Sequence, residues 1–234
     1  MRNIHRSSKC QKAYYVFKCR VAAKEMTSEI QAQLIDGSEA GTEYTYSVKE
    51  YADYLINNES NNAAYARAVP LVKKMLNYGA YTQIYFDKNP TNLANKDLPE
   101  EDKALGDVTI TPPETSFYLP DGVTFEGATL SLKSETTLSL YFKSDTKLAF
   151  SAKGKTVDRA ASGGYQIARI RDISANELSN NVALTVTAGE ASGSASYSPM
   201  NYFYKVLNGS SDDENLKNAL KALYGYAQEA KKYF

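Results

Sequence analysis

The sequence contains few of the residues on which many enzymes and disulfide-stabilised proteins depend. Its 234 residues include one histidine, two cysteines and no tryptophan. Lysine plus arginine equals aspartate plus glutamate, at 27 each, so no excess positive charge indicates binding to nucleic acid or to an acidic membrane. No run approaches the roughly 20 apolar residues of a membrane-spanning helix. The basic N-terminus has no apolar signal-peptide segment, so we expect a soluble chain that is not inserted in a membrane.

A duplication dominates the sequence. Residues 46–86 contain YSVKEYADYLIN and VKKMLNYGAYTQIYF, and residues 197–234 contain YSPMNYFYKVLN and KNALKALYGYAQEAKKYF. Upstream, AAKEMTSEI matches SANELSNNV and aligns Glu25 with Glu177. A repeat of about seventy residues indicates two related modules rather than a solenoid. An alternating segment, 123–150, precedes the second copy but has no counterpart before the first, so we expect the first module to be truncated at its front.

Alternating apolar residues predict strands in both copies. In the first copy, residues 15–21 and 30–34 alternate, and Asp36-Gly37 predicts a hairpin turn. In the second copy, residues 130–186 contain successive period-two segments. With helices closing each copy, the sequence predicts an α+β fold in which antiparallel, β-sandwich-like sheets are each followed by a helix pair, with the whole arrangement duplicated.

Capping signals predict where the helices begin. Ser47 and Glu50 have the spacing of a capping box, so a short helix is expected over residues 48–56. Ser211 and Glu214 have the same spacing and predict a second capping box.

A longer helix is expected over residues 63–86 and again in the second copy. Pro70 removes a helical hydrogen bond and predicts a kink or a late start in the first of these helices. Apolar residues recur at steps of three and four at matching positions of both helices, which indicates a buried face on each.

Side chains suited to nucleophilic catalysis are scarce. The single histidine, His5, lies in an N-terminal segment that is not expected to position an imidazole for Ser–His or Cys–His catalysis. Ser144 and Lys147 have the spacing of a Ser/Lys pair, but they fall on an expected turn between strands rather than at a helix start. No nucleophile elbow, zinc-protease motif, phosphate-binding loop or dinucleotide fingerprint occurs. We therefore predict no catalytic residue, no cofactor and no enzyme activity.

Carboxylates are the remaining candidates for chemistry. Glu25 and Glu177 occupy the same position of the two copies, so they are expected in separate modules, where each caps a turn or is solvated. The acidic segment 87–102 offers oxygen ligands of the kind that calcium prefers, but it lacks the ordered spacing of a calcium loop. A polar connector is the favoured interpretation, calcium binding by this segment stays open, and no metal site is predicted.

Tyrosine is abundant, with 19 residues, and four of them cluster on the short helices: Tyr51, Tyr54, Tyr202 and Tyr204. Exposed tyrosines stack on sugar rings or anchor protein partners, because each supplies area and a hydroxyl group. Tyr51 and Tyr202 are retained between the copies, which favours packing within each module instead. Packing is the favoured interpretation, and binding of a sugar or a protein partner stays open.

The two cysteines leave two possibilities. Cys10 and Cys19 either form a disulfide that closes the N-terminal segment or remain two thiols, with thiols favoured. Cys19 is expected on the inward face of a strand.

The motifs YSVKEYADYLIN, VAAKEMTSEIQAQL, GATLSLKSETTLSLYF and YSPMNYFYKVLN resemble an uncharacterised repeat module of large extracellular proteins from gut Gram-positive anaerobes of the Clostridia type. The resemblance covers roughly residues 13–234. It implies an extracellular or cell-surface location, with no catalytic motif that transfers to this chain.

Together these features predict a disordered segment 1–12, a truncated first module 13–87, a connector 88–116 and a β-rich second module 117–234. The expected function is that of a non-catalytic structural or adhesive module of a larger cell-surface protein, with an unassigned ligand. The alternative is a glycan-binding module that uses exposed tyrosines. Partners would be other surface proteins or glycans, and the sequence does not indicate an oligomeric state.

Overall fold

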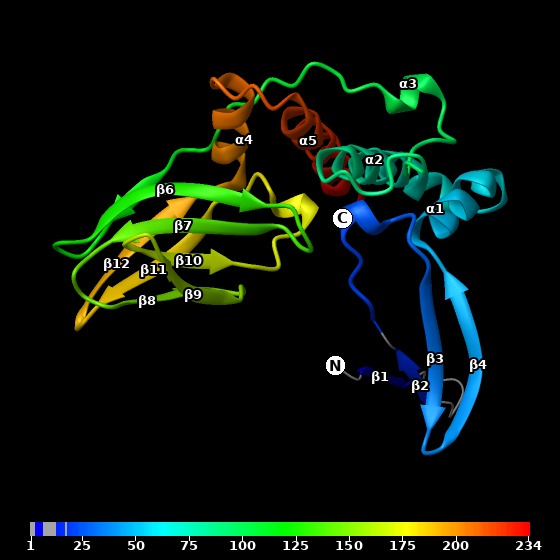
Figure 1. Cartoon of the computed structure of the whole chain (residues 1–234), viewed down its shortest axis with the longest axis horizontal. Helices are drawn as coiled ribbons and strands as arrows, with labels where there is room; N and C mark the ends of the chain where they lie inside the picture. Colours follow the sequence, from blue (N-terminus) through cyan, green and yellow to red (C-terminus); the bar gives the residue numbers. More distant parts are fainter. Residues whose placement is uncertain (1–2, 7–12, 17) are drawn as a thin grey trace.

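The computed structural model describes residues 3–6, 13–16 and 18–234 (Figure 1). This part of the chain has a mixed α+β fold in which every strand pairing is antiparallel. It contains two four-stranded sheets, ordered β6-β7-β10-β9 and β5-β12-β11-β8, and two hairpins, β1-β2 and β3-β4. The predicted α+β class and antiparallel pairing are confirmed.

The strands are β1 (Asn3–Arg6), β2 (Ala13–Val16), β3 (Ile30–Asp36), β4 (Glu39–Tyr46), β5 (Ser116–Tyr118), β6 (Thr124–Ser131), β7 (Thr137–Lys143), β8 (Leu148–Ala152), β9 (Val157–Ser162), β10 (Tyr165–Ile170), β11 (Val182–Ala188) and β12 (Ala191–Tyr197). The α-helices are α1 (Val48–Asn57), α2 (Ala63–Tyr85), α3 (Glu100–Lys103), α4 (Pro199–Asn208) and α5 (Glu214–Tyr233). Short 3₁₀ turns are η1 (Ala23–Glu25), η2 (Glu59–Asn61) and η3 (Ala175–Glu177).

The two four-stranded sheets share one hydrophobic cluster. Inward residues of β7, such as Leu138 and Phe142, belong to the same cluster as Leu184 and Val186 of β11, and all four are at most 1% exposed. Alternate residues of a strand point to opposite faces, so each sheet contributes the apolar residues of one face to this cluster. Helices α4 and α5 extend this cluster through Phe203 and other residues.

The long helices α2 and α5 join the two halves of the chain. Tyr78 of α2 stacks on Tyr226 of α5, with ring centroids 6.1 Å apart and an interplanar angle of 15°. Arg67, near the start of α2, donates to the carbonyl of Tyr233 at the end of α5, so the helices run antiparallel. Tyr78 and Tyr226 occupy aligned positions of the two similar sequence segments, so the two helices meet through aligned residues.

A second hydrophobic cluster belongs to the first half. It is built from α1, α2 and the following segment, with Ala52, Leu76 and Leu98 among its members. Gly79 lets η1 pack closely on α2, because a Cβ there would lie 2.6 Å from the sulfur of Met26. No residue of β3 or β4 belongs to either cluster in the described part of the chain.

The connector after α2 is ordered against that helix. The buried amide of Gln83 donates to the carbonyl of Asn92 and accepts from the backbone N–H of Ala94. Asn77 likewise accepts a hydrogen bond from the side chain of Asn95. The Gln83 amide satisfies backbone groups that would otherwise be buried without partners, and the Asn77–Asn95 bond ties the segment to α2 through side chains, so the segment follows one path without regular structure.

The helix starts agree with the sequence in part. The capping box at Ser47 and Glu50 is confirmed. The one predicted at Ser211 and Glu214 is wrong, because Asp213 caps α5 by accepting from the N–H of Leu216. Helix α2 runs through Pro70 from Ala63, so the late start is also wrong.

The N-terminal expectations differ from the structure in two places. Residues 3–6 form β1, paired with β2, where a disordered segment was expected. The predicted strand 15–21 ends at Val16 as β2, and Cys19 is exposed rather than inward. Cys10 lies outside the described residues, so the pairing of the two cysteines stays a prediction.

The same order of elements occurs twice. A 3₁₀ turn, a hairpin, a ten-residue helix and a long helix follow one another from η1 to α2 and again from η3 to α5. The first hairpin, β3–β4, projects from the helices and lies apart from the four-stranded sheets (Figure 1). The second hairpin, β11–β12, forms the middle of a sheet.

Candidate functional site

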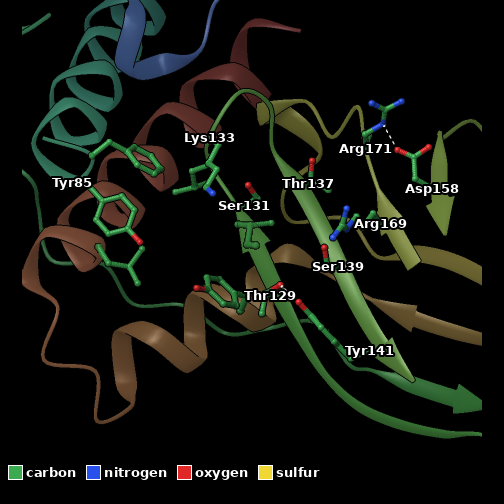
Figure 2. A pocket seen from close by; sticks show the side chains of 15 residues that line it. Tyr85, Thr129, Ser131, Lys133, Thr137, Ser139, Tyr141, Asp158, Arg169 and Arg171 are labelled. Atoms are coloured by element: carbon green, nitrogen blue, oxygen red, sulfur yellow. Dashed lines mark hydrogen bonds and ion pairs between the residues drawn. The ribbon is translucent and has the colours of Figure 1, made fainter. Parts of the chain in front are cut away.

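A groove lies on the face of the sheet β6-β7-β10-β9 that points away from the shared cluster, beside the ends of three helices (Figure 2). We call it the outer-sheet groove. Its volume is about 610 Å³. Its lining residues are Tyr85, Phe86, Thr129, Leu130, Ser131, Leu132, Lys133, Thr137, Ser139, Tyr141, Asp158, Arg169, Arg171, Tyr202 and Leu216.

Strand register brings polar residues into one row across the floor of the groove. Thr129 of β6 pairs with Ser139 of β7, Ser139 pairs with Arg169 of β10, and Arg169 pairs with Asp158 of β9. Their neighbours along the strands, such as Leu138, point into the buried cluster. Period-two alternation therefore places this polar row on the outer face.

Tyr141 closes one end of this row. Its hydroxyl lies 3.2 Å from the hydroxyl of Thr129, and its ring meets that of Tyr165 edge to face at 6.1 Å. Ile167, which pairs with Tyr141 in register, is 2% exposed although it lies on the outer face. The ring of Tyr141 is therefore held in place by packing against Tyr165 as well as by its hydrogen bond with Thr129.

The two arginines of the groove differ in their partners. The Nε atom of Arg171 lies 3.0 Å from a carboxylate oxygen of Asp158, and its Nη1 atom lies 3.6 Å from Glu135 (Figure 2). Arg169 is exposed and has no ion pair among the described residues. Since a guanidinium group presents five N–H donors in one plane, Arg169 offers donors that a bound anion can take.

Aromatic side chains from the helices form the opposite wall. Tyr85 and Phe86 come from the end of α2, with ring centroids 4.7 Å apart, and Tyr202 comes from α4. Burial, and secondarily the nearby Tyr85, raises the pKa of Tyr202 above its ordinary value, so its hydroxyl stays protonated at neutral pH. The wall therefore offers ring surface together with the neutral hydroxyl group of Tyr202.

The paired glutamates of the two copies do not form a site. Glu25 accepts a hydrogen bond from Ser28 at 2.6 Å. Glu177 accepts from Lys155 at 2.7 Å and from the backbone N–H of Ser174 at 3.0 Å. Burial raises the pKa of Glu177, but these hydrogen bonds outweigh it and lower the pKa to about 2. Each glutamate is bound within its own half. Glu177 caps η3 as expected, whereas Glu25 accepts only from side chains and caps no turn.

The acidic segment is tied to lysines. The Nζ atom of Lys49, in a side chain that is nearly buried, lies 2.6 Å from Asp97, and Lys73 lies 2.7 Å from Asp102. Within residues 3–6, 13–16 and 18–234, no group of three or more His, Cys, Asp or Glu residues is placed to hold a metal ion.

The residues considered for nucleophilic catalysis do not form a catalytic arrangement among the described side chains. The hydroxyl of Ser144 accepts the backbone N–H of Thr146, which stabilises the turn between β7 and β8. This is the turn position that the sequence predicted for Ser144 and Lys147. His5 lies in β1, and its side chain is outside the described structure.

Exposed tyrosines are dispersed rather than gathered at the groove. They lie on β4, α1, β5 and α4, as Tyr44, Tyr46, Tyr51, Tyr54, Tyr118 and Tyr204. The expectation that Tyr51 is packed is wrong, because α1 turns Ala52 and Leu55 toward α2 and leaves Tyr51 54% exposed. Tyr202 is half-buried, as expected of a packed position.

Sequence reasoning missed the residues of the groove floor. Thr129, Ser139 and Arg169 belong to no catalytic or ligand-binding motif, but each is a polar residue at an outward position of a period-two strand. This alternation of polar and apolar residues shows which face of a strand is exposed, but it does not show which strands are neighbours in the sheet. The register of β6, β7 and β10 is what brings the three together.

Comparisons of the chain with family models, curated proteins and solved structures found no match. Among the helices described here, none has both the length and the apolar character needed to cross a bilayer. The candidate site is thus defined by its geometry.

Proposed function

We propose that the chain is a non-catalytic adhesive module of a larger cell-surface protein, and that its outer-sheet groove binds an acidic glycan. The observation that carries this proposal is the row of hydroxyl groups ending at Arg169, which faces an aromatic wall across an open groove. The resemblance of the sequence motifs to repeat modules of extracellular proteins supports the cell-surface location.

The chemistry of the groove suits a charged sugar. A guanidinium group binds a carboxylate or sulfate group in a bidentate geometry. Hydroxyls such as those of Thr129 and Ser131 donate to and accept from sugar hydroxyls, and the ring of Tyr85 offers a face on which a sugar ring packs. In the alternative predicted from the sequence, exposed tyrosines bind the glycan. The groove instead contains Tyr85, Tyr141 and Tyr202, so we assign glycan binding to these three residues.

The proposed architecture is a β-sandwich with a helix pair, present once completely and once in part. The shared cluster between the two four-stranded sheets supports the sandwich. The repeated order of elements from η1 to α2 and from η3 to α5 supports a duplication. Tyr78 and Tyr226 occupy aligned positions of the two halves, and their rings stack. An isologous interface between two identical modules pairs like surfaces in this way, so the stacking supports an origin by duplication.

The glycan proposal is tested with oligogalacturonate, whose carboxylates are free, and with its methyl ester, in which the same backbone carries no charge. We expect the full chain to bind the free acid more tightly than the ester in calorimetry. The variant Arg169→Gln should lose at least about tenfold in affinity for the acid, equivalent to about 1.4 kcal/mol.

Lys143→Gln is the matched control, because Lys143 is an exposed cation on β7 that does not line the groove. It should bind as the unchanged chain does. Equal binding of acid and ester, or an equal loss in both variants, would contradict the proposed site. Release of new reducing ends from the oligosaccharide would contradict the non-catalytic role.

A further inference from the structure

The two hairpins of the chain match in length, turn and register. Strands β3 and β11 have seven residues each, and each is followed by a glycine at positive φ, Gly37 at 61° and Gly189 at 60°. Ile30 pairs with Tyr46 as Val182 pairs with Tyr197. The one difference is an extra residue in β4, at the register shift opposite Gln33 to Ile35.

This match aligns an exposed apolar face with a buried one. The inward residues of β11 and β12 are Leu184, Val186, Ala195 and Tyr197, all 9% exposed or less. The corresponding residues of β3 and β4 are Ala32, Leu34, Tyr44 and Tyr46. Leu34 is 63% exposed, Tyr44 69% and Tyr46 47%.

In the second half of the chain, the edge of the corresponding strand β11 is covered by another strand. Strand β8 pairs along the edge of β11, with Ala152 opposite Leu184, Phe150 opposite Val186 and Leu148 opposite Ala188. Within the described residues, β3 pairs with β4 and with no other strand. The N–H and C=O groups of β3 that point away from β4 therefore form an open edge that can accept a strand. Strand β4 is the poorer acceptor, because the extra residue interrupts its regular spacing.

Charge identifies the kind of segment that fits. Residues 30–46 contain three acidic residues, Asp36, Glu39 and Glu43, and no lysine or arginine. The β8 segment has the opposite character, with Lys147 and Lys153 directly flanking Leu148–Ala152. A second copy of the chain would oppose two acidic hairpins, and like charges across an interface disfavour that pairing.

We propose that β3 is the acceptor edge of an incomplete β-sheet, and that it binds an extended segment of another polypeptide with apolar residues at alternate positions and lysines at its ends. The segment adds antiparallel to β3, with an apolar side chain beside Leu34 in the place that Phe150 takes beside Val186. This inference rests on the proposed equivalence of the two halves. It concerns a different surface from the glycan groove.

The test uses the full chain and a fluorescent peptide with the sequence of residues 145–154, DTKLAFSAKG. We expect saturable binding that weakens with added salt, together with slower amide exchange in residues 30–36. The Leu34→Asp variant should bind at least about tenfold more weakly.

Two controls make the test specific. Ile35→Asp changes the adjacent residue, which is equally exposed at 64% but lies on the opposite face of β3, and it should bind more tightly than Leu34→Asp. A peptide with the residues at positions 149 and 150 exchanged moves the phenylalanine to the other face and should also bind poorly.

Three outcomes would overturn the inference: no saturable binding, equal binding by both variants, or protection outside β3. Light scattering that showed dimers dissolved by Leu34→Asp would instead assign the face to a second copy of the chain. The Arg169→Gln measurement leaves this surface unchanged, so failure of one proposal is distinguishable from failure of the other.

Discussion

The two hairpins of this protein show how little of a strand's burial is encoded in the strand itself. β3–β4 and β11–β12 have the same turn geometry and the same pairing where each hairpin opens, apart from one extra residue in β4, and each precedes a capped helix. The second is flanked by β5 and β8, and its apolar residues belong to the hydrophobic cluster that the two four-stranded sheets share. The first lacks those neighbours in the described structure, and its apolar side chains remain exposed.

The largest difference in stability is expected when one leucine of each hairpin is truncated. Leu184→Ala removes a side chain that is 1% exposed and should lower the free energy of unfolding by about 2–5 kcal/mol through lost burial and a residual cavity. Leu34→Ala removes an exposed side chain and should change it by less than about 0.5 kcal/mol. Urea denaturation of both variants measures the difference, and similar losses would show that β3 is covered in solution.

The matching glutamates predict a smaller effect that depends on pH. The pKa of Glu177 falls from 4.5 unfolded to about 2 folded, so its carboxylate stabilises the protein above pH 4.5, and that contribution is lost as the pH falls toward 2. Since the side chain of Glu177 is 36% exposed, solvent screening reduces the contribution to about 1–2 kcal/mol.

Glu177→Gln should therefore flatten the rise of stability between pH 2 and 4.5. Glu25→Gln should flatten it less, because Glu25 has a lowered pKa from its bond to Ser28 but no partner as close as Lys155. Denaturation curves collected across this range provide the test. If Glu25→Gln changed the pH dependence of the unfolding free energy more than Glu177→Gln, the prediction would be wrong.

The helix caps predict the smallest difference. Ser47→Ala removes the hydroxyl that accepts the N–H of Glu50 and should cost about 1 kcal/mol. Ser198 is fully buried, and its hydroxyl also donates to the carbonyl of Leu178, so Ser198→Ala should cost nearer about 2 kcal/mol. Thermal unfolding of the two variants would separate these values, and equal losses would mean that the second hydrogen bond contributes nothing.

Local features were the part of the fold that the sequence predicted well. The hairpin turn at Gly37, the capping box at Ser47 and the extent of α2 all follow from interactions within a few residues. The cap of α5 was misplaced because Asp213 and Ser211 compete for nearby N–H groups, and spacing does not rank them. The candidate groove was not predicted, since Ser139 and Arg169 are thirty positions apart and meet through strand pairing.

What the sequence determined by itself is local: the hairpin turn at Gly37, the start of α1 at Ser47, the extent of α2, and which side of a strand is apolar. These properties arise from backbone geometry and short-range hydrogen bonds, so nearby residues are enough to predict them. Which apolar faces become core was decided by tertiary structure, because burial requires a second surface. Val186 has one in the opposing sheet, while Leu34, at the matching position, is left facing solvent.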